Sequence, residues 1–184
     1  RGDKMRVFIA LNLPERTKDN LERSANQFKT HATKGRFVPK ANYHVTLHFI
    51  GNIDENRLLY VQSALDGVRE MIAPRLAVSQ FTVLRASNIV CAKFGKNENL
   101  AKLHEALGNK LEQTGFAVEH RAYRPHVTII REYGFELPFS EVTKFVDVYN
   151  KPFDAPEVVL YESVSGKDGV TYRPLYAVTL ETEE

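Results

Sequence analysis

The sequence predicts a mixed fold of strands and helices that forms two pseudo-symmetric lobes around a shared cleft. Segments rich in β-forming residues alternate with segments of helical periodicity. In addition, one unit of strand, helix, loop and histidine-containing strand occurs twice, from Val7 to Ile50 and from about Ile89 to Ile130. Because the unit is present only twice, we expect a pair of lobes rather than a solenoid, with one histidine strand from each lobe at the cleft.

The start of the chain predicts two strands with a helix between them. Segment 6–13 (RVFIALNL) is rich in β-formers, and segment 43–50 (YHVTLHFI) is a second strand that Gly51-Asn52 should end. Apolar residues at helical spacing predict a helix over 14–29, which Pro14 can begin. We interpret the stretch 31–42 as a loop, with a candidate short strand at Phe37-Val38.

The middle of the chain predicts a second helix and a pair of strands. Asp54 can cap a helix whose apolar residues recur at helical spacing to about Ile72, and Pro74 ends it. Segments 76–84 and 88–94 are predicted as the two strands that follow.

A third helix is predicted after these strands. It begins at Asn97 or Asn99, carries leucines at helical spacing and ends at Gly115. Three further segments complete the prediction: a strand at 126–131 (HVTIIR), an ambiguous stretch at 135–149, and a hairpin formed by 157–165 and 170–180.

The composition is that of a globular protein, with 43% hydrophobic and 26% charged residues. No apolar run approaches the roughly 18 residues that a membrane span needs. The first apolar stretch, Val7 to Leu13, is too short for a secretory signal. Cys91 is the only cysteine and has no disulfide partner in the chain, so we expect a reducing compartment, the cytoplasm. Neither a membrane partner nor an obligate protein partner is expected.

The chain of 184 residues fits one domain, and no linker or low-complexity segment interrupts it. We therefore predict a single bilobal domain over residues 5–184 with an internal duplication. Residues 1–4 (Arg-Gly-Asp-Lys) precede Met5 and are interpreted as a candidate cloning remnant, excluded from the fold prediction.

The charge balance is mildly basic, with a net charge of +2 and an isoelectric point of about 8.6. A protein that coats long duplexes shows a stronger basic stripe, so a small anionic ligand or the end of a nucleic acid fits better. Basic residues precede both histidine strands, although either cluster alone is also typical of a solvated loop. They are Lys34, Arg36 and Lys40 before His44, and Arg121 and Arg124 before His126.

Both histidine strands carry the same short motif, HVTL at 44–47 and HVTI at 126–129. In a strand, residues two apart face the same side, so the His and the Thr of each motif share one face and the apolar residues take the other. A third His-x-Thr, at His31, lies in a predicted loop and is interpreted as coincidence. The alternative is that both histidines are structural and the threonines serve β-propensity. Two matching copies within a repeated unit favour a functional pair.

Paired histidines suit phosphoryl chemistry near neutral pH, because an imidazole titrates near pH 6.5. A neutral ring can take a proton from water while a charged ring donates one to a leaving oxygen. Threonine hydroxyls beside them can bind phosphate oxygens. We therefore predict His44 and His126 as catalytic and Thr46 and Thr128 as phosphate-binding residues.

Metal binding is the competing interpretation of the histidines. His44 and His48 are four residues apart, as in helical zinc motifs, but they lie on a predicted strand, and Val45 stands where such a motif needs Glu. No further His, Asp, Glu or Cys cluster completes a site. A phosphate-binding glycine loop and a serine nucleophile elbow are also absent from the sequence. We predict neither a metal nor a cofactor.

The doubled His-x-Thr motif resembles the 2H phosphoesterase superfamily, and its context is closest to the RNA 2′,3′-cyclic phosphodiesterases, also called 2′-5′ RNA ligases. The resemblance covers nearly the whole chain from Met5. It is carried by RVFIA at 6–10 with Pro14, FVP at 37–39, HVTLHFIG at 44–51, RAYRPHVTIIR at 121–131, and Leu160, Glu162-Ser163, Gly169, Tyr172 and Leu175.

This resemblance implies a bilobal α+β fold, with two pseudo-symmetric lobes of antiparallel sheet flanked by helices around a central cleft. It implies that RNA or nucleotide 2′,3′-cyclic phosphates are hydrolysed to 2′-phosphomonoesters without a metal. By the family pattern, His44 is the proton donor and His126 is the proton acceptor that activates water. From the residues alone, the two histidines are nearly interchangeable.

Three further residues are candidate substrate contacts: Arg131, Arg124 and His48. Strict alternation places His48 on the face of Thr46. It places Arg131 opposite His126, unless the strand ends or bulges there. Two aromatic residues, Phe8 and Phe49, could stack on a base, but aromatic residues in strands are usually part of the core.

Two other functions require different tests. Ligation or cleavage of 2′-5′ linked oligonucleotides would use the same residues, so only turnover on each substrate separates it from cyclic phosphate hydrolysis. A non-catalytic module that binds nucleotides or RNA ends could keep the threonines and arginines, but it would not need two intact histidines.

Overall fold

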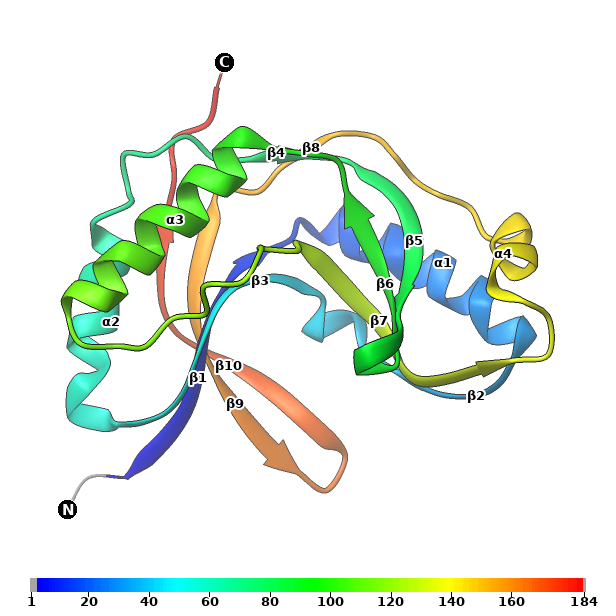
Figure 1. Cartoon of the computed structure of the whole chain (residues 1–184), viewed down its shortest axis with the longest axis horizontal. Helices are drawn as coiled ribbons and strands as arrows, with labels where there is room; N and C mark the ends of the chain where they lie inside the picture. The colour runs from blue at the N-terminus through cyan, green and yellow to red at the C-terminus, as the bar shows by residue number, and fades with distance from the viewer. Residues whose placement is uncertain (1–2, 184) are drawn as a thin grey trace.

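The computed structural model describes residues 3–183, which form two antiparallel sheets with helices packed against them (Figure 1). The η elements are short 3₁₀ helices. In chain order the elements are β1 (Lys4–Asn12), α1 (Glu15–His31), β2 (Ala32–Phe37), η1 (Lys40–Asn42), β3 (His44–Asp54), η2 (Glu55–Arg57), α2 (Leu58–Asp66), β4 (Arg75–Leu76), β5 (Val78–Leu84), η3 (Arg85–Ser87), β6 (Ile89–Phe94), α3 (Glu98–Gln113), β7 (His126–Phe135), α4 (Phe139–Val142), η4 (Thr143–Phe145), β8 (Phe153–Asp154), β9 (Glu157–Gly166) and β10 (Gly169–Thr179).

Each of the two four-stranded sheets contains one histidine strand. The β3 sheet has the order β10-β9-β1-β3, and the β7 sheet has the order β2-β7-β6-β5. All of their neighbouring strands are antiparallel. Strand β3 is the outer strand of its sheet. The predicted α+β class with two sheets flanked by helices is confirmed.

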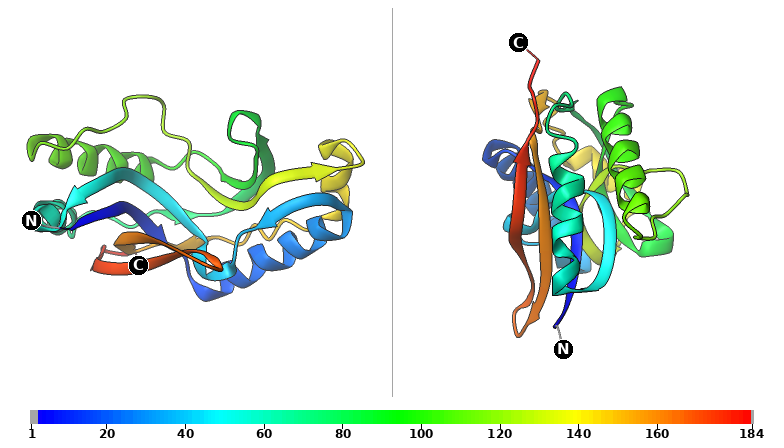
Figure 2. Two further views of the ribbon diagram at one scale, coloured as in Figure 1. Left: turned by 90° about the horizontal axis from the view of Figure 1, so that it is seen from below. Right: turned by 90° about the vertical axis from the view of Figure 1, so that its left-hand side faces the viewer.

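The helices of the repeated unit are exchanged between the two sheets. Helix α1 follows β1, but it packs on the β7 sheet, where Phe28 contacts Phe81 of β5 and Phe135 of β7. Helix α3 follows β6, but it packs beside α2 against β3 of the other sheet. Figures 1 and 2 show α2 and α3 on one side of the molecule and α1 and α4 on the other. Each lobe is therefore built from both copies of the unit, which the linear pattern did not predict.

The two long helices form where apolar periodicity predicts them. On α1 the predicted apolar face is buried at Leu21, Ala25 and Phe28. The Asn97 side chain caps α3 by accepting a hydrogen bond from the Leu100 amide at 2.9 Å. Each leucine side chain buried on α3 contributes roughly 1.5–3 kcal/mol of transfer free energy. These residues are Leu100, Leu103, Leu107 and Leu111, none more than 2% exposed.

Three predicted boundaries are wrong. Gly51-Asn52 does not end β3, because Gly51 adopts φ +96° and the strand continues to Asp54 opposite β1. Asp54 makes no capping hydrogen bond and instead pairs with Lys4 at 3.2 Å. The helix therefore begins later, at Leu58, and it ends at Asp66 rather than near Ile72.

The stretch 31–42, predicted as a loop, contains β2 and η1. Strand β2 is an edge strand that pairs only with β7, so most of its side chains are exposed and no apolar alternation marks it. At the start of the chain, Asp3 and Lys4 take part in the fold although they were excluded from the prediction. Lys4 pairs with Asp54, and the Asp3 carbonyl accepts a hydrogen bond from the Glu55 amide at 3.2 Å. Residues 1 and 2 lie outside the described residues.

Among residues 3–183, none of the helices has the length and the apolar content that crossing a membrane requires.

Candidate active site

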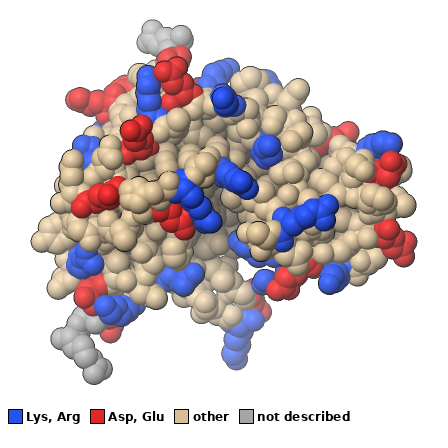
Figure 3. Space-filling model, viewed as in Figure 1, with Lys and Arg blue, Asp and Glu red and all other residues tan. Residues whose placement is uncertain are grey.

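A cleft of about 880 Å³ lies between the β3 sheet and the β7 sheet. Figure 3 shows a hollow in the middle of this face, with Lys and Arg side chains gathered around it. The residues that line the cleft come from both sheets and from the β9-β10 hairpin. They are Arg6, Phe8, Arg36, Phe37, Val38, Pro39, Asn42, His44, Thr46, Phe49, Ser87, Ile89, His126, Thr128, Arg131, Ser163, Ser165, Asp168, Gly169, Val170 and Tyr172.

The four residues of the doubled motif line this one cleft. His44 and Thr46 come from β3, and His126 and Thr128 come from β7. The intervening valines of both motifs are fully buried on the opposite face. The predicted division of each strand into a polar face and an apolar face is therefore present in the structure.

Backbone carbonyls fix the orientation of both imidazoles. Nδ1 of His44 lies 2.8 Å from the carbonyl oxygen of Asn42, and Nδ1 of His126 lies 2.7 Å from that of Arg124. A carbonyl oxygen can only accept, so each Nδ1–H donates and each neutral ring keeps its lone pair on Nε2. Nε2 of His44 contacts the hydroxyl of Thr46 at 2.9 Å. Both rings thus keep Nε2 for proton transfer.

The surroundings of His44 favour its neutral form. Its ring lies against buried Phe8, at 5.0 Å between centroids, and against the edge of Tyr172, at 5.1 Å. Desolvation in this setting lowers the pKa of His44 to about 4, although the hydrogen bond to the Asn42 carbonyl acts in the opposite direction. The nearby positive charge of Arg131 lowers this pKa further.

The same β-bulge follows the motif in both strands. On β3, Thr46 pairs with Ala10 and His48 pairs with Ile9, so Leu47 is an extra residue. On β7, Thr128 pairs with Cys91 and Ile130 pairs with Val90, so Ile129 is an extra residue. One extra residue reverses the alternation of every side chain that follows it.

These bulges overturn two predictions and decide a third. His48 does not share the face of Thr46. It is 6% exposed, beneath α3, so its predicted place in the cleft is wrong. Phe49, predicted as core, is 49% exposed and lines the cleft. At the corresponding position of β7, Arg131 turns into the cleft, as a bulged strand allows. Phe8 is buried as predicted, and it also lines the floor of the cleft.

Arginine placement was only partly predictable. The Arg124 side chain is exposed and is not among the cleft-lining residues, although its carbonyl orients His126. Arg36 does line the cleft, and it forms a two-point ion pair with Glu132 at 3.0 and 3.2 Å. Arg6 also lines the cleft, with its guanidinium 4.8 Å from the ring centre of Phe49. Arg36 belongs to the basic cluster before His44, so its place near the site could be expected from the sequence. No local pattern in the sequence indicated that Arg6 would line the cleft.

Within residues 3–183, no group of three or more His, Cys, Asp or Glu side chains is arranged to hold a metal ion. Cys91 is fully buried opposite Thr128, and desolvation raises the pKa of its thiol to about 11. The described residues therefore offer no metal-ligand set beside the two histidines.

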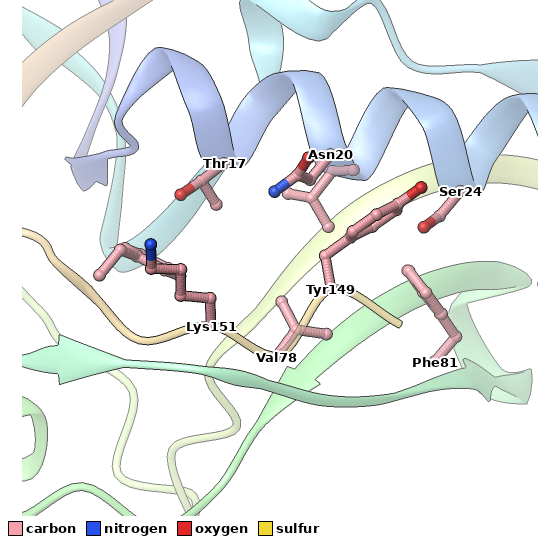
Figure 4. Close-up of a pocket in the computed structure, with 9 residues that line it drawn as sticks. Thr17, Asn20, Ser24, Val78, Phe81, Tyr149 and Lys151 are labelled. Carbon is pink, nitrogen blue, oxygen red and sulfur yellow. The ribbon is translucent and has the colours of Figure 1, made fainter. Parts of the chain in front are cut away.

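A second pocket lies between α1 and the segment near Tyr149 and Lys151 (Figure 4). Its volume of about 20 Å³ suits a single water molecule and cannot hold a nucleotide. Thr17, Asn20 and Ser24 supply its polar groups from the helix. The four residues of the doubled motif line the large cleft and not this pocket, so the cleft is the candidate active site.

Known sequences match this chain over nearly its whole length. Residues 11–90 match the family described as LigT like Phosphoesterase. The RNA 2′,3′-cyclic phosphodiesterase of Methanocaldococcus jannaschii is 28% identical over 182 residues, covering 96% of this chain and 99% of the relative. The protein of that name from Thermotoga maritima is 24% identical and covers 96% of both chains. The one from Escherichia coli is 24% identical and covers 95% of this chain and 96% of its own.

Solved structures share the fold. E. coli LigT complexed with 3′-AMP superposes with a TM-score of 0.81 at 21% identity, covering 97% of this chain and 99% of that one. A protein from Thermus thermophilus superposes with a TM-score of 0.77 at 21% identity, covering 98% of this chain and 100% of that one. The sequence matches, the shared fold and the paired motifs in one cleft agree. The chain is therefore similar in sequence and in fold to the LigT-like phosphoesterases.

Proposed function

We propose that this protein hydrolyses 2′,3′-cyclic phosphates, at RNA ends or on small nucleotides, to 2′-phosphomonoesters. The observation that carries the proposal is the pair of imidazoles in one cleft, each with Nδ1 held by a backbone carbonyl and Nε2 kept for proton transfer. The name RNA 2′,3′-cyclic phosphodiesterase, borne by relatives that match almost end to end, supports the same reaction.

In the proposed reaction, water attacks phosphorus while the bond to the 3′ oxygen breaks. Nε2 of His126 takes a proton from the water, and Nε2 of His44 gives a proton to the leaving 3′ oxygen. The products are a 2′-phosphate and a free 3′-hydroxyl. The hydroxyls of Thr46 and Thr128 donate hydrogen bonds to the non-bridging oxygens as negative charge builds on them. Each proton transfer contributes roughly 10²–10⁴-fold to the rate.

The low pKa of His44 is compatible with its role as donor only when the substrate is bound. In the cleft without substrate, desolvation keeps this ring neutral near pH 7. A phosphate anion within hydrogen-bond reach favours the charged imidazolium. Binding of the cyclic phosphate therefore charges His44, and the proton it takes up is the one that it later donates.

The walls of the cleft suit a nucleotide end. Arg6, Arg36 and Arg131 line it, whereas Asp168 is the one acidic residue among its lining residues. Phe49 presents an exposed ring on which a base can stack, a contact worth roughly 1–3 kcal/mol. The volume of about 880 Å³ lies within the range of small-molecule sites.

The proposal is tested by hydrolysis of 2′,3′-cyclic nucleotides and of a short RNA ending in a cyclic phosphate, in EDTA. We expect turnover in wild type and a loss of roughly 10²–10⁴-fold in His44→Ala and in His126→Ala. His31→Ala is the matched control, since His31 belongs to the third His-x-Thr, stacks on Phe145 and lies outside the cleft lining. The phosphate position in the product identifies the bond that breaks.

Three results would count against the proposal: loss of activity in EDTA, an equal loss in His31→Ala, or no turnover by wild type. In the last case, turnover on 2′-5′ linked oligonucleotides would identify the related activity, which uses the same residues. Binding of nucleotides that survives both histidine substitutions, without any turnover, would identify a non-catalytic module.

We also propose a reducing compartment, the cytoplasm, as the site of action. The single cysteine, Cys91, is a fully buried free thiol, as expected of a protein that does not rely on disulfides.

A further inference from the structure

Three nearly parallel rings stack outside the cleft, between β3, α3 and the segment that leads into β7. The rings of His48 and His104 lie 4.2 Å apart between centroids with an interplanar angle of 14°. The rings of His104 and Tyr123 lie 3.9 Å apart with an angle of 7°. None of the three residues lines the cleft, so the proposed chemistry does not use them directly.

Each ring of this stack comes from a different element. The bulge at Leu47 turns His48 of β3 away from the cleft and beneath α3. His104 lies on α3, and Tyr123 belongs to the irregular segment between α3 and β7. Nε2 of His48 lies 2.7 Å from the carbonyl oxygen of His104 and donates to it, which fixes the first ring to the helix.

Helix α3 leaves space for the stack by carrying a glycine at its centre. A Cβ atom on Gly108 would lie 3.1 Å from Cε1 of His48 and 3.3 Å from Nε2 of the same ring, closer than ordinary contact. Glycine in a helix interior costs about 1 kcal/mol relative to alanine. Helix propensity alone would therefore favour alanine at position 108, whereas the close approach of the His48 ring favours glycine.

Tyr123, the last ring of the stack, is hydrogen-bonded to the first motif. The phenol of Tyr123 donates a hydrogen bond to the carbonyl oxygen of Thr46 at 2.7 Å. Strand β3 is the outer strand of its sheet, so Tyr123 holds it from the side that no strand covers. The Thr46 hydroxyl contacts Nε2 of His44, and Tyr123 stands three residues before His126. One side chain is therefore tied to both motifs.

We propose that Tyr123, His104 and His48 are positioning residues, which hold the first motif at the correct separation from the second. The inference rests on the proposed function, because it matters only if both imidazoles act on one phosphate. A displacement of about 1 Å in such a pair can cost roughly 100-fold in rate, while contacts that bind the substrate elsewhere persist. The stack thus controls kcat more than KM.

The first test compares kcat and KM of Tyr123→Phe and wild type on a 2′,3′-cyclic nucleotide. This change keeps the ring in the stack and removes its hydrogen bond to Thr46. We expect kcat to fall roughly tenfold and KM to change less than about twofold. Tyr133→Phe, the same change on β7 outside the cleft lining, should leave both constants unchanged. A normal kcat in Tyr123→Phe, or a loss confined to KM, would overturn the proposal.

The second test separates stacking from general stability. His104→Phe keeps a flat ring and should retain kcat within about threefold, whereas His104→Ala and Gly108→Ala should lower it roughly tenfold at a temperature where both remain folded by circular dichroism. Equal activity in His104→Phe and His104→Ala would show that the stack is packing alone.

A third readout does not depend on activity. NMR signals of the His44 and His126 rings should both shift in Tyr123→Phe and stay in place in Tyr133→Phe. If wild type hydrolyses no cyclic phosphate, the proposed function fails, and these signals still decide the positioning. Unchanged His44 and His126 signals in Tyr123→Phe would refute it.

Discussion

A single backbone carbonyl, two residues upstream, determines how each proposed catalytic histidine meets its substrate. Asn42 supplies it for His44, and Arg124 supplies it for His126. Because the anchors are main-chain atoms, side-chain substitution at either position leaves the orientation of the ring in place. The sequence predicted the histidines, but it could not predict these anchors, which depend on the path of the chain just before each strand.

The pKa of the His44 ring should depend on whether phosphate is bound. In the protein without ligand its ring should titrate well below the ordinary value of 6.5, because burial lowers its pKa to about 4. Inorganic phosphate should raise this pKa by favouring the imidazolium. NMR titration of the ring with and without phosphate measures both values, and sodium chloride at equal ionic strength is the control. A ring that titrates at 6.5 or above before phosphate is added would contradict the account of how the donor is charged.

At the scale of single elements, the bulges explain why part of the site was hidden from sequence. Regular alternation correctly placed His44, Thr46 and their counterparts on β7. It failed after the fourth motif residue, because Leu47 and Ile129 are inserted against a partner strand that lies elsewhere in the chain. The misplacement of His48 and Phe49 has this one cause. A bulge is a property of a strand pair, so a single strand's pattern does not contain it.

Helices α1 and α3 and most strands could be predicted, because their own residues carry the burial pattern. Strand β2 could not, since it is an edge strand whose only neighbour is β7 and whose exposed Lys34, Gly35 and Arg36 carry no apolar alternation. The position of an arginine at the cleft is equally hard to predict from sequence, because it depends on which strands pair. Arg36 reaches the site only because β2 pairs with β7.

The side-chain cap of Asn97 should stabilise helix α3. Asn97→Ala removes the side-chain oxygen that accepts from the Leu100 amide, and it should lower the free energy of unfolding by about 1 kcal/mol. Urea denaturation followed by circular dichroism measures the change. Asn99→Ala, two residues further along, is the control and should have a smaller effect. Equal losses in the two variants would show that the cap does not stabilise the helix.

For the whole molecule, three histidines that are shielded from solvent link folding to pH: burial lowers the pKa of His48 as well as those of His44 and His104. Desolvation lowers the pKa of both His44 and His104 to about 4, whereas both titrate near 6.5 in the unfolded chain. Between these values the unfolded chain binds more protons, so the free energy of unfolding should fall as pH drops from about 6.5 toward 4. Urea unfolding at several pH values measures this slope, which should be shallower in His104→Phe. A flat dependence across that window would contradict the burial of these rings.

The exchange of helices between the lobes bears on how such a protein can arise. A chain with only one copy of the unit would have Phe28 of α1 without the sheet that covers it, and a single histidine strand. In a pair of such chains, the helix of each could pack on the sheet of the other, which is the arrangement of a domain-swapped dimer. Joining two such chains into one polypeptide would give the connectivity of the present molecule. In this architecture, the packing of each lobe and the two-histidine cleft both need elements from each half of the chain.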